Sequence, residues 1–345
     1  MADLVRPAQR LDILVGFADA LPDPCLLLDR RGVVLHRNAM AADQFPAVNE
    51  GSLLTLALRA ASLLDAIETV RRTEAPQAVE LHQTVPNETW HRANVVPLPG
   101  GEGLLAVVLQ SLTDQKRMEQ LRSDFIANVS HELRTPLTSL IGFIDTLLGP
   151  AAKDEVARER FLNIMRTQAA RMSALIDDLL SLSRIELRQH LRPTGTVDLS
   201  LLLREVREGL ETQARDAGVK IEITAPELTA VTGDQNELYE VFENLMDNAI
   251  KYGGDGGMVE VAIGEGRLGY DYAVTVSDHG IGIEQQHVPR LTERFYRVDA
   301  ESSRKKKGTG LGLAIVKHIV NRHRGQLTIR SKPGEGTRVE VILNK

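Results

Sequence analysis

A stripe of apolar residues at helical spacing constrains the fold of this chain more than any other feature. Its members recur at three- and four-residue steps: Phe125, Val129, Leu133, Leu137, Leu140 and Ile144. The stripe predicts one long helix from about residue 113 to 149, which Gly149-Pro150 ends. A second stripe, of Met172, Leu175, Leu179 and Leu182, predicts another helix over residues 154–187.

These two helices are separated by a short connection, so we expect them to form an antiparallel hairpin. One hairpin leaves an apolar stripe exposed to water, and the sequence offers no other long helical stripe to cover it. We therefore expect two chains to pair as a homodimer with a four-helix bundle. A bundle closed by other parts of the same chain is the alternative.

The polar face of the first helix carries groups that could react. His131 lies roughly opposite the apolar stripe, and Thr135 follows one turn later on the same face. Glu132 is the next residue after His131. A neutral imidazole can attack a phosphoryl group, and a carboxylate can orient its other nitrogen and accept a proton. An ordinary surface histidine is the alternative. Pro136 removes one intrahelical hydrogen bond and predicts a bend.

Composition excludes several classes of protein. The chain has 345 residues, which suggests two or three domains, and its net charge of -6 argues against nucleic acid as a partner. The single Cys25 excludes an intramolecular disulfide, and the nine histidines show no zinc-ligand spacing. No apolar run approaches the ~18 residues that span a bilayer. We expect a cytoplasmic chain, which could be the soluble part of an inner-membrane protein whose membrane anchor is absent from it.

The first third of the chain predicts a small α/β domain. Two short strands come first, at residues 25–29 and 32–35, and a helical stretch follows, clearest at 53–70. Three β-like runs then cover residues 77–84, 90–98 and 104–109, with turns at 86–88 and 99–101.

This order resembles that of a PAS sensor domain. The segments that carry the resemblance are Leu21-Pro22-Asp23-Pro24, Leu28-Asp29-Arg30-Arg31-Gly32-Val33-Val34 and Asn38-Ala39. No cysteine or histidine is placed convincingly for flavin or haem. We therefore expect a ligand-free dimerising or signal-relay domain.

After a linker at Arg192-Pro193-Thr194-Gly195 the pattern changes to alternating helices and strands. The predicted helices are residues 199–216, 234–252 and 311–322. The predicted strands are residues 219–224, 257–263, 270–277, 325–331 and 337–343. An α/β domain is therefore expected at the end of the chain.

The second of these helices has a polar face. Asn244, Asn248, Lys251 and Tyr252 share it, at steps of four, three and one residues. Amide oxygens suit Mg²⁺, which usually bridges substrate phosphates, and a lysine can meet phosphate charge. Asparagines that merely face solvent are the alternative.

A second motif follows a predicted strand. Asp278 at the strand end can accept a hydrogen bond from an exocyclic amine. Gly280 and Gly282 lack side chains and would let a planar ring approach the backbone. A simple turn after a strand is the alternative.

A third motif is glycine-rich and runs into a helix. It reads Gly308-Thr309-Gly310-Leu311-Gly312-Leu313. Free backbone N–H groups and the helix dipole favour phosphate at such a helix start. Leu313 stands where a dinucleotide fingerprint needs glycine, and the Gly-Lys-Ser/Thr of a P-loop is absent. The preceding run Arg304-Lys305-Lys306-Lys307 is either solvated or a phosphate contact.

In this order, the three motifs resemble the N, G1 and G2 boxes of the GHKL-type ATP-binding domain of histidine kinases. Phe295-Tyr296-Arg297 resembles the F box of that family, and Ser130-His131-Glu132-Leu133-Arg134-Thr135-Pro136-Leu137 resembles its H box. The resemblance covers about residues 113 to 345. Within the family, the arrangement is most similar to that of phosphate-regulon sensor kinases.

The resemblance implies an α+β multidomain fold. Residues 1–112 would be the PAS-like sensor, and residues 113–190 the dimerisation and histidine phosphotransfer domain. Residues 191–345 would be the catalytic α/β sandwich of GHKL (Bergerat) type. Such a kinase phosphorylates its own histidine from ATP with Mg²⁺. It then passes the phosphoryl group to an aspartate on the receiver domain of a response regulator, and it can also remove that phosphate.

The resemblance also implies a role for each matching residue. His131 would be the phosphoacceptor, Glu132 its general base, and Thr135 the group that orients water for dephosphorylation. Asn248 would hold Mg²⁺, with Asn244 supporting it.

Other matching residues would surround the nucleotide. Lys251, Tyr252 and Arg297 would line the phosphate side, while Asp278, next to Gly280 and Gly282, would recognise adenine. The G2 glycines Gly308, Gly310 and Gly312 would shape the hinge of an ATP lid, and Thr309, Leu311 and Leu313 of the same motif would also bind the nucleotide. Two residues depart from the pattern. Lys307 stands where many members have glycine, and His279 stands where asparagine or threonine is frequent.

Two further interpretations remain open at this point. One is an ATPase of the same superfamily, with Glu240 or Glu243 activating water on the helix that carries the asparagines. The other is a non-catalytic scaffold that relays the state of the PAS-like domain through the helices. The His131-Glu132 pair disfavours the first, and the intact nucleotide motifs disfavour the second.

Overall fold

The computed structural model describes residues 7–58, 60–84, 87–98, 103–188, 190–253, 257–267, 269–298 and 308–345. The sequence predictions at Pro86, at residues 99–101 and at Arg304 to Lys307 lie outside these ranges. The chain divides into two compact units, residues 1–126 and 127–345, and the boundary lies within a single helix, α5 (Thr113–Leu148). The division into three domains stays a prediction. Within the described ranges, every helix is too short or too polar to cross a membrane.

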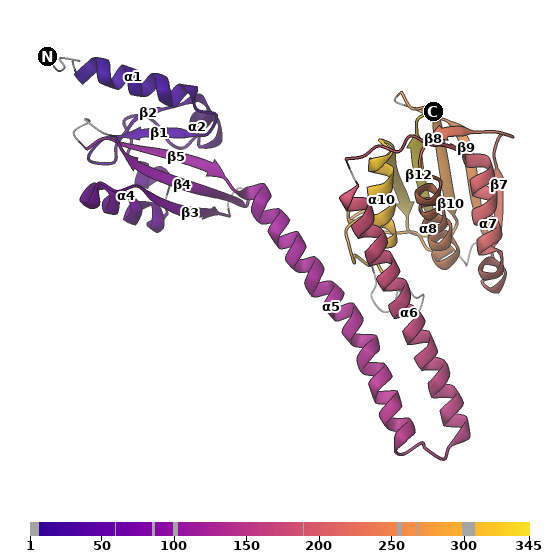
Figure 1. Ribbon diagram of the computed structural model, residues 1–345. Coiled ribbons are helices and arrows are strands. Elements are labelled where there is room, and N and C mark those ends of the chain that lie inside the picture. Colours follow the sequence, from indigo (N-terminus) through magenta and orange to yellow (C-terminus); the bar gives the residue numbers. More distant parts are fainter. Residues whose placement is uncertain are drawn as a thin grey trace. The chain divides into compact units, whose positions relative to one another are not determined.

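The first unit contains a five-stranded antiparallel sheet with helices around it (Figure 1). Its elements are α1 (Pro7–Ala20), β1 (Cys25–Leu28), β2 (Val34–Arg37), α2 (Ala39–Gln44), α3 (Leu54–Ala57), α4 (Ala61–Thr73), β3 (Gln77–Gln83), β4 (Thr89–Pro97) and β5 (Leu105–Ser111). The strand order is β2-β1-β5-β4-β3. The helical stretch predicted at residues 53–70 is divided into α3 and α4, because Leu58 is extended and ends the first helix.

Strand β1 is buried along its whole length because both faces of the sheet are covered. Leu26 and Leu28 join the larger apolar core with residues of α2, α3 and α4. Cys25 and Leu27 point to the other face, where they pack with Ala18 of α1. Alternate side chains of a strand point to opposite faces, which explains why this strand reads as a continuous apolar run.

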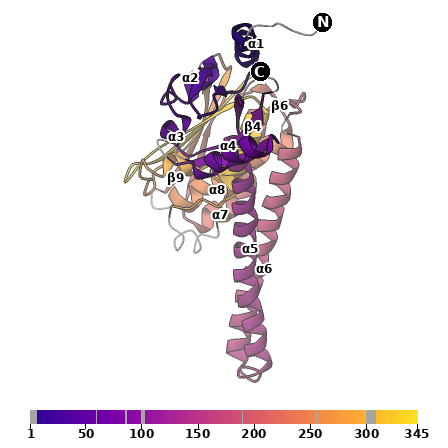
Figure 2. The ribbon, with the colours of Figure 1, turned by 90° about the vertical axis from the view of Figure 1, so that its left-hand side faces the viewer.

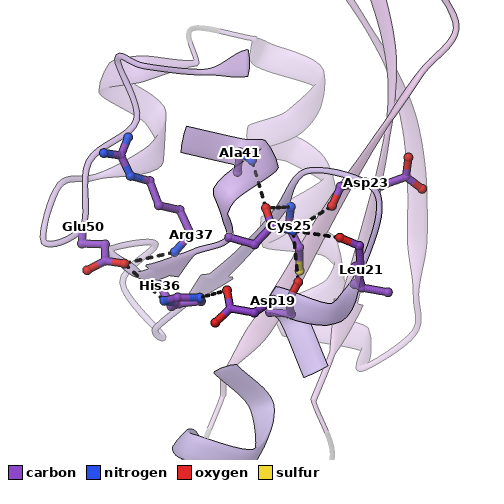
Figure 3. A network of polar contacts seen from close by, with 10 residues as sticks. Asp19, Leu21, Asp23, Cys25, His36, Arg37, Ala41 and Glu50 are labelled. Atoms are coloured by element: carbon purple, nitrogen blue, oxygen red, sulfur yellow. Dashed lines mark hydrogen bonds and ion pairs between the residues drawn. The ribbon is translucent and has the colours of Figure 1, made fainter. Parts of the chain in front are cut away.

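The side chain of Asn38 holds α1, β1 and α2 together, and its partners Asp23, Cys25 and Ala41 are labelled in Figure 3. Its side chain is buried; the Oδ1 atom accepts from the backbone N–H of Cys25 and of Ala41, at 2.9 Å each. The Nδ2 atom donates to the carbonyl oxygens of Ala18 at 3.0 Å and Asp23 at 2.9 Å. One amide therefore makes at least four hydrogen bonds to backbone groups.

His36 makes a second polar link in the same network (Figure 3). Its Nε2 lies 2.8 Å from Asp19 Oδ1, and its Nδ1 lies 3.3 Å from Glu50 Oε1. The end of α1 is thereby tied to the loop after α2.

The second unit begins with the hairpin that the sequence predicts. Helix α6 (Glu155–Leu187) follows α5 and lies alongside it (Figure 2). Its N-cap Asp154 accepts from the backbone N–H of Ala157. The rings of Phe143 and Phe161 stack at 5.1 Å, and Arg171 donates to Glu132. These two contacts are eleven residues apart on α5 and ten apart on α6, which defines the antiparallel register.

The rest of the second unit is an α/β sandwich. Its elements are β6 (Thr196–Asp198), α7 (Leu199–Asp216), β7 (Lys220–Thr224), β8 (Ala230–Thr232), α8 (Gln235–Gly253), β9 (Met258–Glu265), β10 (Tyr272–Asp278), η2 (Val288–Arg290), α10 (Gly312–Arg322), β11 (Gln326–Lys332) and β12 (Gly336–Leu343). The main sheet has the order β11-β12-β10-β9-β7, in which only β7 and β9 run parallel. Helices α7, α8 and α10 pack together on this sheet. The small β6-β8 sheet was missed, because strands of three residues show no measurable period.

We expect Asn38→Ala to lower the stability of the first unit by about 2–4 kcal/mol, because buried backbone groups lose their partners. The single Trp90 lies in β4, so its fluorescence during urea unfolding reports on this unit. The matched control is Asn49→Ala, at an exposed position. Equal midpoints for the two variants would contradict the role of Asn38.

Candidate functional site

The three polar motifs of the last third meet at one cavity of about 420 Å³. Most of the predicted residues line it: Asn244, Asn248, Lys251, Tyr252, Asp278, Gly282, Arg297, Gly308, Thr309, Gly310, Gly312 and Leu313. Gly280 and Leu311 are buried behind it. The cavity has the size of a small-molecule site.

Helix α8 forms one wall of the cavity because it is amphipathic. Its apolar residues pack into the sandwich at helical spacing: Leu238, Val241, Phe242, Leu245, Met246, Ala249 and Ile250. The opposite face presents the asparagines. The Nδ2 atom of Asn244 donates to the carbonyl of Glu240 at 2.9 Å, and Lys251 Nζ lies 2.5 Å from Asp247 Oδ2.

Asp278 ends β10 and is held by backbone donors. Its Oδ1 accepts from the N–H of Gly280 at 2.9 Å and from the N–H of Thr337 at 3.3 Å. Burial raises the pKa of the Asp278 carboxyl above its usual value, although these hydrogen bonds and His279 act in the opposite direction. The carboxyl is therefore fixed in place at the wall of the cavity.

The G1 glycines are required by close backbone packing. A Cβ atom on Gly280 would collide with the carbonyl oxygen of Tyr252. A Cβ atom on Gly282, whose φ is +67°, would collide with the carbonyl oxygen of Lys332. The structure thus gives these glycines a packing role; approach of a planar ring, which the sequence predicts, stays a prediction.

The G2 loop turns into α10 beside the F box. Gly310 has a φ of +78°, and its carbonyl accepts from the N–H of Phe295 at 2.8 Å. Phe295 itself has a φ of +63°, a conformation that costs a bulky residue energy. Gly312, the first residue of α10, lies so close to Asn244 Oδ1 that a side chain would collide with it.

Helix α6 supplies an acidic group that the sequence analysis missed. Asp178 lines the cavity, and its Oδ2 accepts from the Thr309 hydroxyl at 2.6 Å. Burial raises the pKa of the Asp178 carboxyl, against the opposing effect of this hydrogen bond. Asp178 lies in an ordinary amphipathic helix, so no local signal marks it.

The H-box glutamate meets the F-box arginine. Glu132 Oε2 accepts from Arg171 Nη2 and from Arg297 Nη2, at 3.1 Å each. The same Nη2 of Arg297 donates to the carbonyl of Thr309 at 2.9 Å. The structure thus brings Glu132 to a residue that lines the cavity.

His131 and Thr135 remain at the surface of α5, outside the cavity. The Thr135 hydroxyl donates to the His131 carbonyl at 3.1 Å, one turn back along the helix. An exposed imidazole is accessible to a reactive group brought from outside.

Two more residues escaped the sequence analysis. Thr337 lines the cavity and donates to Asp278, and the turn Gly334-Glu335-Gly336-Thr337 carries a glycine signal that could have found it. Arg171 contacts Glu132 from α6, and only the hairpin register could have indicated it. Among the described residues, no group of three or more His, Cys, Asp or Glu side chains is arranged to hold a metal.

Two protein-family models match the chain. Residues 121–188 match the His Kinase A (phospho-acceptor) domain, and residues 233–345 match the histidine kinase-, DNA gyrase B- and HSP90-like ATPase. The first range includes His131, and the second includes all three cavity motifs.

Curated relatives are sensor kinases. The chain is 39% identical over 231 residues to the phosphate regulon sensor protein PhoR of Pseudomonas aeruginosa, covering 67% of this chain and 52% of PhoR. It is 32% identical over 339 residues to the sensor protein kinase WalK of Staphylococcus aureus, covering 97% of this chain and 80% of that sequence. In strain Newman the coverage of WalK is 55%. The chain thus spans about half the length of the first of these relatives.

A solved structure shows the same fold. Histidine kinase ThkA, in complex with response regulator protein TrrA, aligns with a TM-score of 0.53 at 19% identity over 95% of this chain and 97% of that chain. The predicted α+β fold with a helical hairpin is confirmed.

We expect Gly280→Ala to destabilise the sandwich by about 1–3 kcal/mol, because the new methyl group has to displace backbone. Gly264→Ala in β9 is the matched control, since a Cβ atom there meets nothing within 4 Å. Thermal unfolding measured by calorimetry, without nucleotide, checks the difference. A Gly280→Ala transition equal to that of the control would contradict the close packing.

Proposed function

This chain belongs to the sensor histidine kinases, and from that membership we propose that it transfers the γ-phosphoryl group of ATP to His131. The phosphoryl group then passes to an aspartate on a response regulator. The observation that carries the proposal is the cavity, where Asn248 of α8, Asp278 of β10 and Gly310 of the G2 loop converge. Each supplies a different part of a nucleotide-binding site.

The proposed nucleotide lies across the cavity with its base at β10. The Asp278 carboxylate, held by two backbone donors, accepts from the adenine amine. Lys251 and Arg297 meet phosphate charge from two sides, and both line the cavity. The start of α10 directs free N–H groups toward the same space.

The donor set fits Mg²⁺ carried by the nucleotide. Magnesium bound with ATP takes most of its ligands from phosphate oxygens and water, and needs only one or two from protein. The Asn248 amide would supply one such oxygen, and Asn244 is fixed next to it by its bond to the Glu240 carbonyl. When bound, the ion would offset charge on the transferring phosphoryl group.

The proposed transfer makes one bond and breaks one at phosphorus. A ring nitrogen of His131 bonds to the γ-phosphorus while the bond to the β–γ bridging oxygen breaks, and ADP leaves with that electron pair. Glu132 accepts the proton from the other ring nitrogen. An aspartate oxygen of the regulator then replaces the nitrogen at phosphorus, and the imidazole recovers its proton.

Thr135 is proposed to act in the removal of phosphate, by orienting water when the chain dephosphorylates its regulator. Its hydroxyl lies one turn from His131 on the same exposed face. The complex of ThkA with TrrA supports a response regulator as the partner.

Dimerisation is proposed from exposed apolar side chains on both helices of the hairpin. They include Leu137, Ile141, Ile144 and Leu148 of α5 and Leu162, Ile176 and Leu180 of α6. A second copy would cover them in a four-helix bundle. The three-domain division and a PAS-like sensor role for the first unit are part of the proposal, as is phosphate regulation, which the identity to PhoR supports.

The geometry disfavours the ATPase alternative. Glu240 accepts from the Ser181 hydroxyl at 2.5 Å, and neither Glu240 nor Glu243 lines the cavity. A water-activating glutamate would need to face the nucleotide. The scaffold alternative does not explain why the nucleotide motifs line one cavity.

His131→Ala should abolish labelling of the chain by γ-labelled ATP with Mg²⁺, because no nucleophile remains at this position. The label on the unaltered chain should be acid-labile and base-stable. His190→Ala, at an exposed histidine, is the control and should label normally. Labelling that survives in His131→Ala would overturn the assignment.

Glu240→Gln should change the rate of autophosphorylation less than about threefold, since general-base loss would cost about 100-fold or more. The measurement is the initial rate of label incorporation at saturating ATP. A loss of nucleotide turnover in Glu240→Gln, with turnover retained in His131→Ala, would favour the ATPase instead. Failure of the unaltered chain to bind nucleotide in a titration would favour the scaffold.

A further inference from the structure

Two arginines share one carboxylate oxygen of Glu132, the residue that follows His131 in the sequence. Arg171 of α6 and Arg297 of the F box each place Nη2 at 3.1 Å from Glu132 Oε2. Both contacts are partly buried, with 18% of the Arg171 side chain and 9% of the Arg297 side chain exposed. The two arginines come from different parts of the unit, so they need not act together.

Arg297 has competing duties. It lines the nucleotide cavity, and its Nη2 already divides its donors between Glu132 and the Thr309 carbonyl. Its buried Nε lacks a hydrogen-bond partner among the described residues. We expect nucleotide phosphate to compete with Glu132 for this guanidinium, because Arg297 lines the cavity and Glu132 does not.

Arg171 is free of that conflict because it lies outside the cavity, on the helix that pairs with α5. Its contact with Glu132 follows the same antiparallel register as the Phe143–Phe161 stack. The hairpin alone therefore fixes this arginine relative to Glu132, whatever nucleotide does to Arg297.

We propose that Arg171 is the positioning residue for Glu132 in phosphoryl transfer, an inference that rests on the proposed function. Arg171 holds the carboxylate against α6 when Arg297 turns to the phosphates. The Glu132 side chain then stays in one rotamer, from which it accepts the imidazole proton of His131. Arg171 itself touches neither the nucleotide nor the imidazole.

The first test measures the initial rate of autophosphorylation of the full chain with Mg²⁺, at increasing concentrations of γ-labelled ATP. Arg171→Ala should lower kcat by about 10- to 100-fold, the cost of a misplaced catalytic group, with KM for ATP unchanged. Arg171→Lys should recover part of the rate, because the observed contact is a single N–O pair that an ammonium can also make. Arg166→Ala, at an exposed arginine five residues earlier on α6, should match the unaltered chain.

A double-mutant comparison separates positioning from a structural role. In a chain that already carries Glu132→Gln, the carboxylate is absent, so adding Arg171→Ala should lower the remaining rate less than twofold. If the second change still lowers the rate tenfold, Arg171 acts through folding or packing and the proposal is wrong.

The outcomes also distinguish this proposal from the proposed function. An unaltered chain that takes up no label refutes the kinase activity itself. An unaltered chain that labels, with Arg171→Ala labelling at the same kcat, refutes only the positioning role. A rise in KM for ATP at constant kcat would place Arg171 in nucleotide binding and would also overturn the proposal.

Discussion

The amphipathic character of α8 is the constraint on which the sandwich depends. One face of this helix has to fill the apolar space above β9 and β10, and Phe242 there is completely buried. The other face has to present amides and Lys251 to the cavity. A shift of α8 by one residue would turn its side chains by about 100°, so the apolar face would leave the core and the polar face would leave the cavity. Folding of the core and assembly of the nucleotide motifs are therefore one event.

Contacts between α6 and the sandwich include several polar pairs, although α6 also buries Leu182 and Ile185. Asp178 meets Thr309, Ser181 meets Glu240, and Glu186 pairs with Arg294. The carbonyl of Arg188 accepts from Arg322 at 3.2 Å. Half-exposed ion pairs contribute little to stability, and polar interfaces inside a chain are typical of parts that separate and meet again. Under the proposed function, the nucleotide has to reach a histidine on the hairpin, and polar contacts of this kind can separate for that step.

Most of the fold was predictable because apolar residues recur at regular spacing along its longer helices and strands. Both hairpin helices and the helices α7, α8 and α10 were found, and the cavity motifs were found from glycine and asparagine spacing. The failures have physical causes. Strands β6 and β8 are too short to alternate, and Asp178 and Arg171 are ordinary residues on an amphipathic helix whose importance comes only from what the tertiary structure places opposite them. Gly280 also has a packing role that the sequence did not indicate, since a side chain there would collide with the Tyr252 carbonyl.

The register of the hairpin determines which movements it can transmit. A slide of α5 by one residue moves Glu132 about 1.5 Å along the axis, a distance that the long side chain of Arg171 can follow. A turn of α5 about its own axis by the ~100° of one residue instead carries Glu132 out of reach. The Glu132–Arg171 pair and the Phe143–Phe161 stack are therefore compatible with a small slide of α5 along its axis and oppose its rotation. Under the proposed function, a twist of α5 would therefore separate Glu132 from Arg171 and affect phosphoryl transfer, whereas a small push along the axis would preserve this contact.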